Sequence, residues 1–264
     1  MQGNYKLYKG AWIIESDSHL EKQLNSLDKN SLLSKGGIMV RNTYDFDCPE
    51  VTSFWYVIKD SFGGMEELST NTRSKVRRCF KTLIVKRITS EELVEEGYSV
   101  YVLAAENYRI KCIPPTIEEF KKRVRNAVEN EYWGVFDNTT GKLVAFSMNL
   151  VSKDTAEYCT LKAIPEYQKK YAYYGLIYEM NRYYLEELKL RYVNDGARSI
   201  TEHSNIQPFL IEKFKFRKAY CHLSLHYKWW LWLAVKCLYP FRKVILNGKV
   251  KAILNMESMA RGDY

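Results

Sequence analysis

Residues 155–188 read TAEYCTLKAIPEYQKKYAYYGLIYEMNRYYLEEL, which predicts a β-strand, a break at Pro165, a short basic and aromatic turn, and a long helix. The amides of a first helical turn have no partners within the helix, and the helix dipole favours negative charge there. A strand that leads into a helix N-terminus can therefore bind anionic groups. Lys162, Lys169 and Lys170 surround this point, so we expect them to contact an anionic ligand.

The sequence around this stretch predicts a layered domain with the order β-β-β-α-β-α-β. Its strands are expected at 132–136, 142–151, 156–164, 191–193 and 219–227, and its second helix at 205–214. Turn signals between the first three strands indicate an antiparallel meander. Two helices precede the meander, each with a capping-box pattern: Thr89 with Glu92, and Thr116 with Glu119. We expect an α/β (α+β) protein, with a mixed sheet and helices on both faces.

Along the chain we expect three consecutive segments. Residues 1–88 form a small β-containing N-terminal segment, residues 89–228 carry the main domain, and residues 229–264 form an aromatic and basic tail. The apolar run at the start of the tail is too short to span a bilayer, and it contains Lys236. We expect residues 229–243 to make a peripheral contact with a membrane surface.

The charge of the chain points to an anionic partner. The formal net charge is +9, which favours a nucleotide phosphate, a nucleic acid or a membrane surface. Arg73, Arg77 and Arg78 crowd a predicted helix within 66–82. They are candidates for contact with phosphate or tRNA, and a solvated basic helix face is the alternative.

The cysteine and histidine patterns predict neither disulfides nor a metal site. The six cysteines show no CxxC pair or metal-type spacing, and no apolar leader opens the sequence, so we expect a cytoplasmic protein that uses no metal. Cys159 and Cys221 lie in apolar strand patterns and are expected to be buried. His222 and His226 share one strand face, but we find no third ligand, so we expect both to face solvent.

The order of elements over 90–228 resembles that of the GNAT superfamily of acyl-CoA-dependent N-acyltransferases. In that family a Gln/Arg-x-x-Gly-x-Gly/Ala turn binds the cofactor pyrophosphate through its amides. Here Gln168 holds the first position, whereas Tyr171 and Tyr173 replace the glycines. Asn205 opens the later helix as in the family, and Ile211 replaces its tyrosine general acid. The resemblance implies that acetyl-CoA or another acyl-CoA binds at Gln168, Lys169, Lys170 and Asn205.

A narrower resemblance is to the Fem-type peptidyltransferases, which are GNAT-like proteins without the acyl-CoA motif. Several of them take the acyl group from aminoacyl-tRNA. The Arg-rich segment 73–78 and the sequence EKFKF at 212–216 are similar to segments of those proteins. On this interpretation, residues 1–88 are a partial or truncated GNAT-like half.

Both resemblances imply an acyl arm held between two parallel strands, 156–164 and 191–195. The free backbone amides of Lys162, Ala163 and Ile164 would bind the arm. Acyl transfer to an amine also needs a base for the ammonium group and an acid for the leaving group. Glu157 and Asp195 are the candidate bases, with His203 as a weaker one, and Tyr174 or Tyr158 is the candidate acid. Each of these residues also has an ordinary structural interpretation.

Three functions stay open at this point. The first is an N-acyltransferase that uses acyl-CoA and a small amine or amino-sugar acceptor. The second is a Fem-like transferase that uses aminoacyl-tRNA and a cell-envelope or glycan precursor. The third is a non-catalytic binding module on a decayed transferase fold, which the replaced glycines and Ile211 favour.

Overall fold

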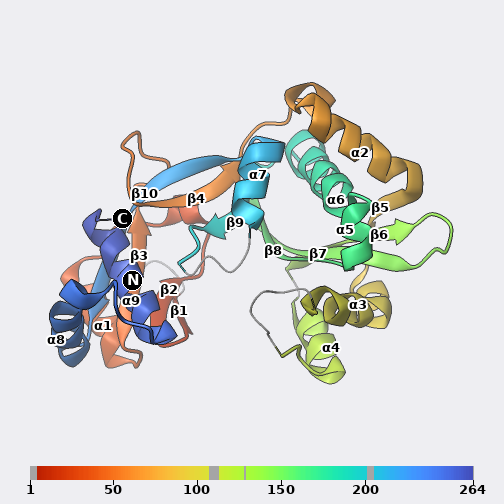
Figure 1. Cartoon of the computed structure of the whole chain (residues 1–264). Helices are drawn as coiled ribbons and strands as arrows, with labels where there is room; N and C mark the ends of the chain where they lie inside the picture. The colour runs from red at the N-terminus through yellow and green to blue at the C-terminus, as the bar shows by residue number, and fades with distance from the viewer. Residues whose placement is uncertain (1–4, 107–112, 128, 201–204, 264) are drawn as a thin grey trace. The chain divides into compact units, whose positions relative to one another are not determined.

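The computed structural model describes residues 5–106, 113–127, 129–200 and 205–263, which form two compact units (Figure 1). Unit 1 comprises the described residues of 1–56, 197–202 and 218–264, and unit 2 comprises those of 57–196 and 203–217. Each unit therefore draws on separate parts of the chain. The three consecutive segments expected from the sequence divide the chain differently, and their limits stay a prediction.

The sheet of unit 2 has the strand order β9-β8-β7-β6-β5. These strands are β5 (Leu83–Ile88), β6 (Asn130–Asp137), β7 (Leu143–Val151), β8 (Thr155–Ala163) and β9 (Tyr192–Ala197). Strands β5 to β8 pair antiparallel, whereas β8 and β9 pair in parallel. The predicted meander and the mixed sheet are confirmed.

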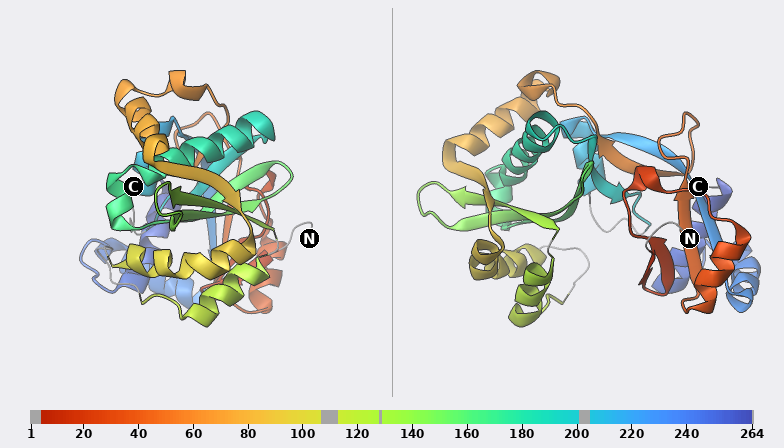
Figure 2. Two further views of the ribbon diagram at one scale, coloured as in Figure 1. Left: turned by 90° about the vertical axis from the view of Figure 1, so that its right-hand side faces the viewer. Right: turned by 180° about the vertical axis from the view of Figure 1, so that it is seen from behind.

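Helices cover both faces of this sheet, as the sequence predicts (Figures 1 and 2). One face carries α3 (Ser90–Ala105) and α4 (Ile117–Asn126). The opposite face carries α2 (Thr70–Thr82), α5 (Pro165–Lys169) and α6 (Ala172–Asn181).

Helices α3 and α4 begin at the two predicted capping boxes. At the start of α3, the Glu92 amide donates to Thr89 Oγ1 over 3.1 Å, and the Thr89 amide donates to Glu92 Oε2 over 2.7 Å. Thr116 and Glu119 repeat this exchange at the start of α4. Each box satisfies two amides that the helix itself leaves unpaired. Phe120 of α4 then packs in the core with residues of α3 and the sheet.

On the opposite face, α6 lies directly against α2. A Cβ atom on Gly175 of α6 would lie only 2.3 Å from the Cys79 Sγ atom of α2. Gly175 therefore permits the close backbone approach of the two helices. Cys79 and Val76 of α2 are fully buried in this contact region.

The segment after Pro165 is divided more finely than the sequence predicts. The basic and aromatic turn contains the short helix α5, and the next helix is separated from it by Tyr171, whose φ is +67°. A large residue rarely adopts this left-handed conformation, which favours glycine. After α6 the chain continues as a π-helix over Arg182–Glu187.

Strand β9 is longer than predicted. The turn-prone sequence Asn194-Asp195-Gly196 was expected to end it, but the strand continues to Ala197. The physical reason is that β9 has a second neighbour in the sheet, β4 (Phe54–Lys59), and hydrogen bonding to that neighbour keeps these residues extended.

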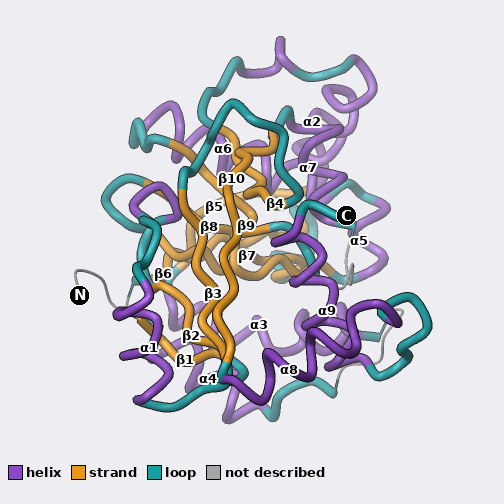
Figure 3. The backbone as a smooth tube through the Cα atoms, turned by 90° about the vertical axis from the view of Figure 1, so that its left-hand side faces the viewer, coloured by secondary structure: helices purple, strands orange, loops and turns teal. Residues whose placement is uncertain are grey.

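Unit 1 contains its own strands and helices (Figure 3). Its strands, in spatial order, are β1 (Tyr5–Tyr8), β2 (Ala11–Ile14), β3 (Met39–Tyr44) and β10 (Arg217–Tyr227), followed by the first residues of β4. Its helices are α1 (Ser26–Ser34), α8 (Trp229–Leu238) and α9 (Gly248–Arg261). Met39, Tyr227 and Leu254 meet in a core that α8 covers with Leu231 and Val235.

The other face of α8 is apolar and exposed. Trp229 is 77% exposed, Trp232 is 53% exposed, and Trp230 and Leu233 are also exposed. We call these four residues the aromatic face of α8. None of the helices that the structure describes is long enough and apolar enough to cross a membrane.

Candidate active site

The two parallel strands of unit 2 separate part-way along their length. Pairing between β8 and β9 covers only Thr155 to Glu157 on β8 and Tyr192 to Asn194 on β9. Beyond these pairs, β8 runs on to Ala163 beside β7 alone. The separation leaves room between the two strands, as the sequence-based resemblance implies.

A cavity of about 830 Å³ lies at this separation. Its lining comes from β8, β9, α3, α5, the segment before α4, and the starts of α6 and α7 (Ile206–Phe214). Six of the candidate site residues that the sequence singles out line it: Glu157, Tyr158, Lys162, Gln168, Asp195 and Asn205. All of them belong to unit 2.

Two carboxylates stand at the point where the strands part. Glu157 is the last β8 residue paired with β9, and Asp195 follows its partner Asn194. Burial raises the pKa of Asp195 to about 7, the negative charge of Glu157 adds to this rise, and hydrogen bonding to Gln207 opposes it. The Gln207 Nε2 atom also donates to the Asp195 backbone carbonyl over 3.3 Å. Asp195 can therefore both take up and release a proton near neutral pH.

Strand β8 carries a β-bulge within the cavity lining. Met148 of β7 pairs with Thr160, but the next residue, Asn149, pairs with Tyr158, so the register shifts by one residue at Cys159. Such an extra residue disrupts the ladder and re-aims its neighbours. Cys159 was expected to be buried, and this expectation was wrong, because the bulge turns Cys159 out to an exposed position in the cavity lining. Cys221 is buried, as predicted.

The expectation of three free amides at the end of β8 needs a correction. The Ile164 amide donates to the Val144 carbonyl over 3.0 Å, so it is not free. Alternate residues of an antiparallel strand point their amides to the same neighbour, so Lys162 also directs its amide toward β7. The amides of Leu161 and Ala163 point the opposite way, toward the separation between the strands.

The polar residues near the start of α6 divide into two groups. Gln168 faces the cavity, and its Nε2 atom donates to the Ala163 carbonyl over 3.2 Å. Lys162 also lines the cavity, with its ammonium 4.8 Å from the Tyr101 ring centroid. Lys169 is exposed and is not part of the lining, and Lys170 lies 3.4 Å from Asp137 at the β6–β7 turn. Of the three lysines, only Lys162 is in the cavity.

The start of α7 supplies a further polar group. Asn205 occupies its N-cap position without a side-chain cap hydrogen bond, and it lines the cavity. His203 lies outside the described residues.

The two candidate acids lie in different surroundings. The Tyr174 hydroxyl accepts a hydrogen bond from Lys75 Nζ over 3.3 Å, and its ring packs against Phe209 of α7. Tyr174 is not part of the cavity lining. The Tyr158 hydroxyl donates to Asn181 Oδ1 over 2.8 Å, and burial raises the pKa of this phenol.

The three arginines of α2 also differ from one another. Arg73 is tied to the loop before α2 by an ion pair with Glu66 at 3.3 Å and a hydrogen bond to the Leu68 carbonyl. Arg77 and Arg78 are exposed on the helix surface. Of the three arginines, Arg77 and Arg78 are therefore better placed than Arg73 to contact an anionic partner.

Comparison with known proteins shows the fold. No family model and no curated protein sequence matches this chain. Among solved structures, FemX is similar with a TM-score of 0.56 and 11% identity, over 81% of this chain and 81% of that one. The C-terminal domain (DUF2156) of the "Putative Lysylphosphatidylglycerol Synthetase" from Agrobacterium fabrum is similar with a TM-score of 0.52 and 12% identity, over 88% of this chain and 82% of that one.

This chain has a GNAT-like fold of the Fem type.

Several lining residues of this Fem-type fold were missed in the sequence. They are Tyr101, Cys159, Tyr173 and Phe209, which come from four different elements. Of these four residues, only Tyr173 could have been predicted to line the cavity, because it replaces a glycine of the family's cofactor-binding turn. The others lie in ordinary helix or strand patterns, so only the tertiary structure brings them to the cavity.

Proposed function

We propose that unit 2 catalyses the transfer of an acyl group to an amine. The observation that carries this proposal is the partly buried Asp195 carboxyl, with a pKa of about 7, beside Glu157 where β8 and β9 separate. A base with a pKa near the working pH is the group that removes a proton from an ammonium most effectively. The Fem-type fold supports the same class of reaction.

The proposed reaction uses the residues of the cavity in order. The donor's acyl arm lies between β8 and β9, where the Leu161 and Ala163 amides can polarise its carbonyl. Asp195 takes a proton from the acceptor ammonium, and the free amine then attacks the carbonyl carbon. A carbon–nitrogen bond forms and the bond to the donor's sulfur or oxygen breaks. The attacking nitrogen then loses its second proton, which passes to the leaving group. Glu157 orients the acceptor and raises the basicity of Asp195.

An acyl-CoA is the first candidate donor. Lys162 and Gln168 line the cavity near the start of α6, where the helix dipole favours a phosphate. Tyr171 adopts the left-handed conformation that a glycine would supply at this turn, so the turn forms without the glycine. Its side chain still crowds the approach of a pyrophosphate to the backbone.

Aminoacyl-tRNA is the second candidate donor. Arg77 and Arg78 form an exposed basic pair on α2, and FemX shares the fold over most of both chains. A tRNA needs several such phosphate contacts outside the cavity, whereas a CoA does not. The acceptor would then be a cell-envelope or glycan precursor, and the aromatic face of α8 would bring the protein to a membrane surface.

Titration calorimetry with acetyl-CoA and a filter-binding assay with aminoacyl-tRNA separate these candidates. If acyl-CoA is the donor, Lys162→Gln weakens acetyl-CoA binding several-fold, and Lys142→Gln on the exposed β6–β7 turn leaves it unchanged. If tRNA is the donor, Arg77→Ala with Arg78→Ala weakens tRNA binding and flattens its salt dependence. Binding of neither donor to the wild-type protein would contradict the proposal and favour a non-catalytic binding module.

A further inference from the structure

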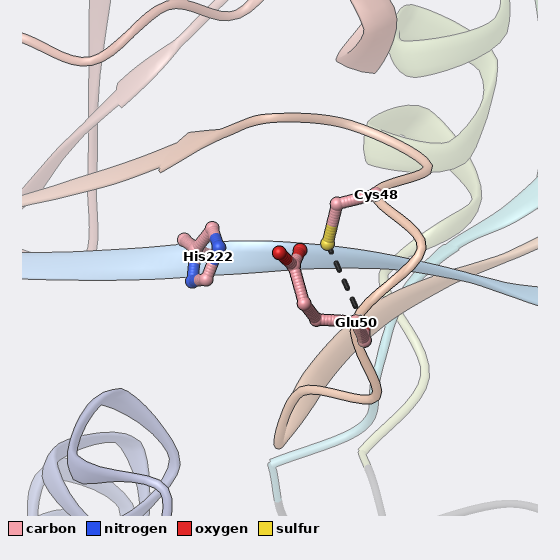
Figure 4. Close-up of side chains that lie close together, drawn as sticks. All are labelled: Cys48, Glu50 and His222. Atoms are coloured by element: carbon pink, nitrogen blue, oxygen red, sulfur yellow. Dashed lines mark hydrogen bonds between the residues drawn. The ribbon is translucent and has the colours of Figure 1, made fainter.

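We propose that Cys48, Glu50 and His222 of unit 1 form a binding site for a zinc-type divalent cation. Cys48 and Glu50 belong to the loop between β3 and β4, and His222 lies on β10 (Figure 4). The Cys48 Sγ atom, a Glu50 carboxylate oxygen and an imidazole nitrogen of His222 all lie within 4.8 Å of one another. This inference does not depend on the function proposed for unit 2.

Backbone hydrogen bonds hold the loop at this place. The Cys48 amide donates to the Tyr220 carbonyl over 3.0 Å, and the Thr52 hydroxyl donates to the Cys221 carbonyl over 2.8 Å. These two anchors sit on the two β10 residues that precede His222. The loop is therefore attached to β10 on both sides of Glu50, and the three side chains are held near one another by the backbone.

Local contacts also restrain the side chains of this cluster. The imidazole of His222 stacks on the Tyr44 ring, with centroids 5.3 Å apart and an interplanar angle of 25°, which limits its rotation. Pro49 fixes the backbone between Cys48 and Glu50, and the Cys48 thiol donates to the Glu50 carbonyl over 3.6 Å. Glu50 is exposed, so its carboxylate can move to a cation without a packing cost.

The geometry and the donor set both suit zinc. Ligand atoms around a tetrahedral zinc ion stand about 3.4 Å apart. Side-chain rotations that move the ligand atoms by roughly 1 Å would therefore bring them to coordination distance. A thiolate, an imidazole and a carboxylate form a mixed sulfur, nitrogen and oxygen set, which suits zinc, whereas magnesium and calcium prefer oxygen alone. Three protein ligands leave a fourth position for water.

A bound ion would clamp the loop to the strand. In the loop, Asp45 and Asp47 have φ values of +54° and +62°, conformations that side-chain-bearing residues rarely adopt. A cation that links Cys48 and Glu50 to β10 would hold this loop against the strand in addition to the two backbone hydrogen bonds.

The sequence pattern showed two histidines and no third ligand, because the loop ligands lie more than 170 positions away from His222. His226 is not part of the site and bonds to Asn30 at 2.8 Å.

The test is a titration of the chelator-treated, full-length protein with Co²⁺ and then Zn²⁺. Cobalt at this site should give a thiolate-to-metal charge-transfer band and the strong visible bands of tetrahedral coordination, with a stoichiometry of one. Competition with a chromophoric chelator then gives the zinc affinity. We expect Cys48→Ser to abolish the charge-transfer band, and we expect His222→Gln and Glu50→Gln each to weaken zinc binding at least about tenfold.

Two matched controls sit in the same unit. Cys237→Ser removes an exposed thiol of α8, and His226→Gln removes the neighbouring histidine of β10, and both should bind metal as the wild-type protein does. The absence of a charge-transfer band in the wild-type protein would overturn the proposal. So would a band that survives in Cys48→Ser, or wild-type zinc affinity in Glu50→Gln, whose exposed side chain can be changed without risk to folding.

Discussion

The cavity of unit 2 and the aromatic face of α8 in unit 1 use burial in opposite ways. In the cavity, partial burial of Asp195 destabilises a charge and moves its pKa to about 7. On α8, apolar rings remain in water, so hydrophobic free energy is left unused. The first fits the catalytic role proposed for the cavity, and the second fits the membrane contact proposed for α8.

Charge sharpens this contrast. The cavity contains Glu157 and Asp195 at its reactive point, whereas the sequence between Lys228 and Met256 contains no acidic residue. Lys228, Lys236, Arg242 and Lys243 accompany the exposed tryptophans there. Basic residues beside tryptophans fit the interface of an anionic lipid bilayer, where rings lie among headgroups.

The largest expected effect is on the chemistry of the cavity. Asp195→Asn removes the proposed base without changing its shape, so the transfer rate should fall by a factor of about 10²–10⁴. In the wild-type protein the rate should rise with pH and reach half its maximum near pH 7, where Asp195 titrates. Initial rates measured from pH 5 to pH 9 with the donor that binds would check both points.

The control for this substitution is Glu118→Gln on α4, whose side chain is exposed and lies outside the cavity lining. It should leave the rate and its pH profile unchanged. A full rate in Asp195→Asn would remove the contrast between the two regions, because the buried carboxyl would then be only structural.

The next effect concerns the surface. Trp229→Ser with Trp232→Ser should reduce binding to vesicles that contain phosphatidylglycerol by about tenfold or more, because each change removes an exposed aromatic ring. The melting temperature should change little, since these rings contribute little to the core. Vesicle sedimentation measures the binding, and Leu27→Ser, at an exposed position of α1, is the matched control. Equal sedimentation of all three proteins would mean that the aromatic face has a different partner.

The third effect is a gain in stability at the active site. The pKa of Asp195 is about 7 in the folded protein, whereas an aspartate in an unfolded chain has its ordinary pKa of 3.8. The folded protein therefore holds a proton that the unfolded chain releases, so this group lowers stability as pH rises from about 4 to 7. Asp195→Asn removes this penalty and should raise the melting temperature at pH 8 by roughly 3 °C or more, with little change at pH 4. Thermal unfolding at the two pH values checks this, and a loss of stability at pH 8 would contradict it.

The smallest effect tests the packing that supports the cavity. Gly175→Ala places a methyl group against Cys79 and should destabilise unit 2 by about 1–3 kcal/mol, through displacement of α2 from α6. Gly248→Ala in α9 has open space around its Cβ position and should be neutral or slightly stabilising. Urea unfolding compares the two variants. Equal stability would show that α2 moves freely away from α6.

Local patterns in the sequence were enough to predict the meander and the two capping boxes. Each depends on residues within a few positions of one another. The separation of β8 from β9 and six of the cavity residues also followed from the sequence, with the help of the family resemblance.

The remaining features depend on contacts that a linear pattern does not contain. The bulge at Cys159 arises from a register shift between β7 and β8, and the same shift exposes a cysteine that looks buried in the strand pattern. The extension of β9 depends on its pairing with β4, far earlier in the chain. The meeting of Cys48 with His222 depends on the pairing of β10 with β3.

The interleaved course of the chain has a consequence for folding during synthesis. Every residue assigned to unit 2 has left the ribosome once position 217 has emerged, so this unit can close early. Unit 1 begins first but must wait for β10, α8 and α9 before β3 gains its second neighbour and the core around Met39 closes. The edge of β3 that pairs with β10 therefore stays unpaired until the chain is nearly complete, and such an exposed edge favours association with other chains.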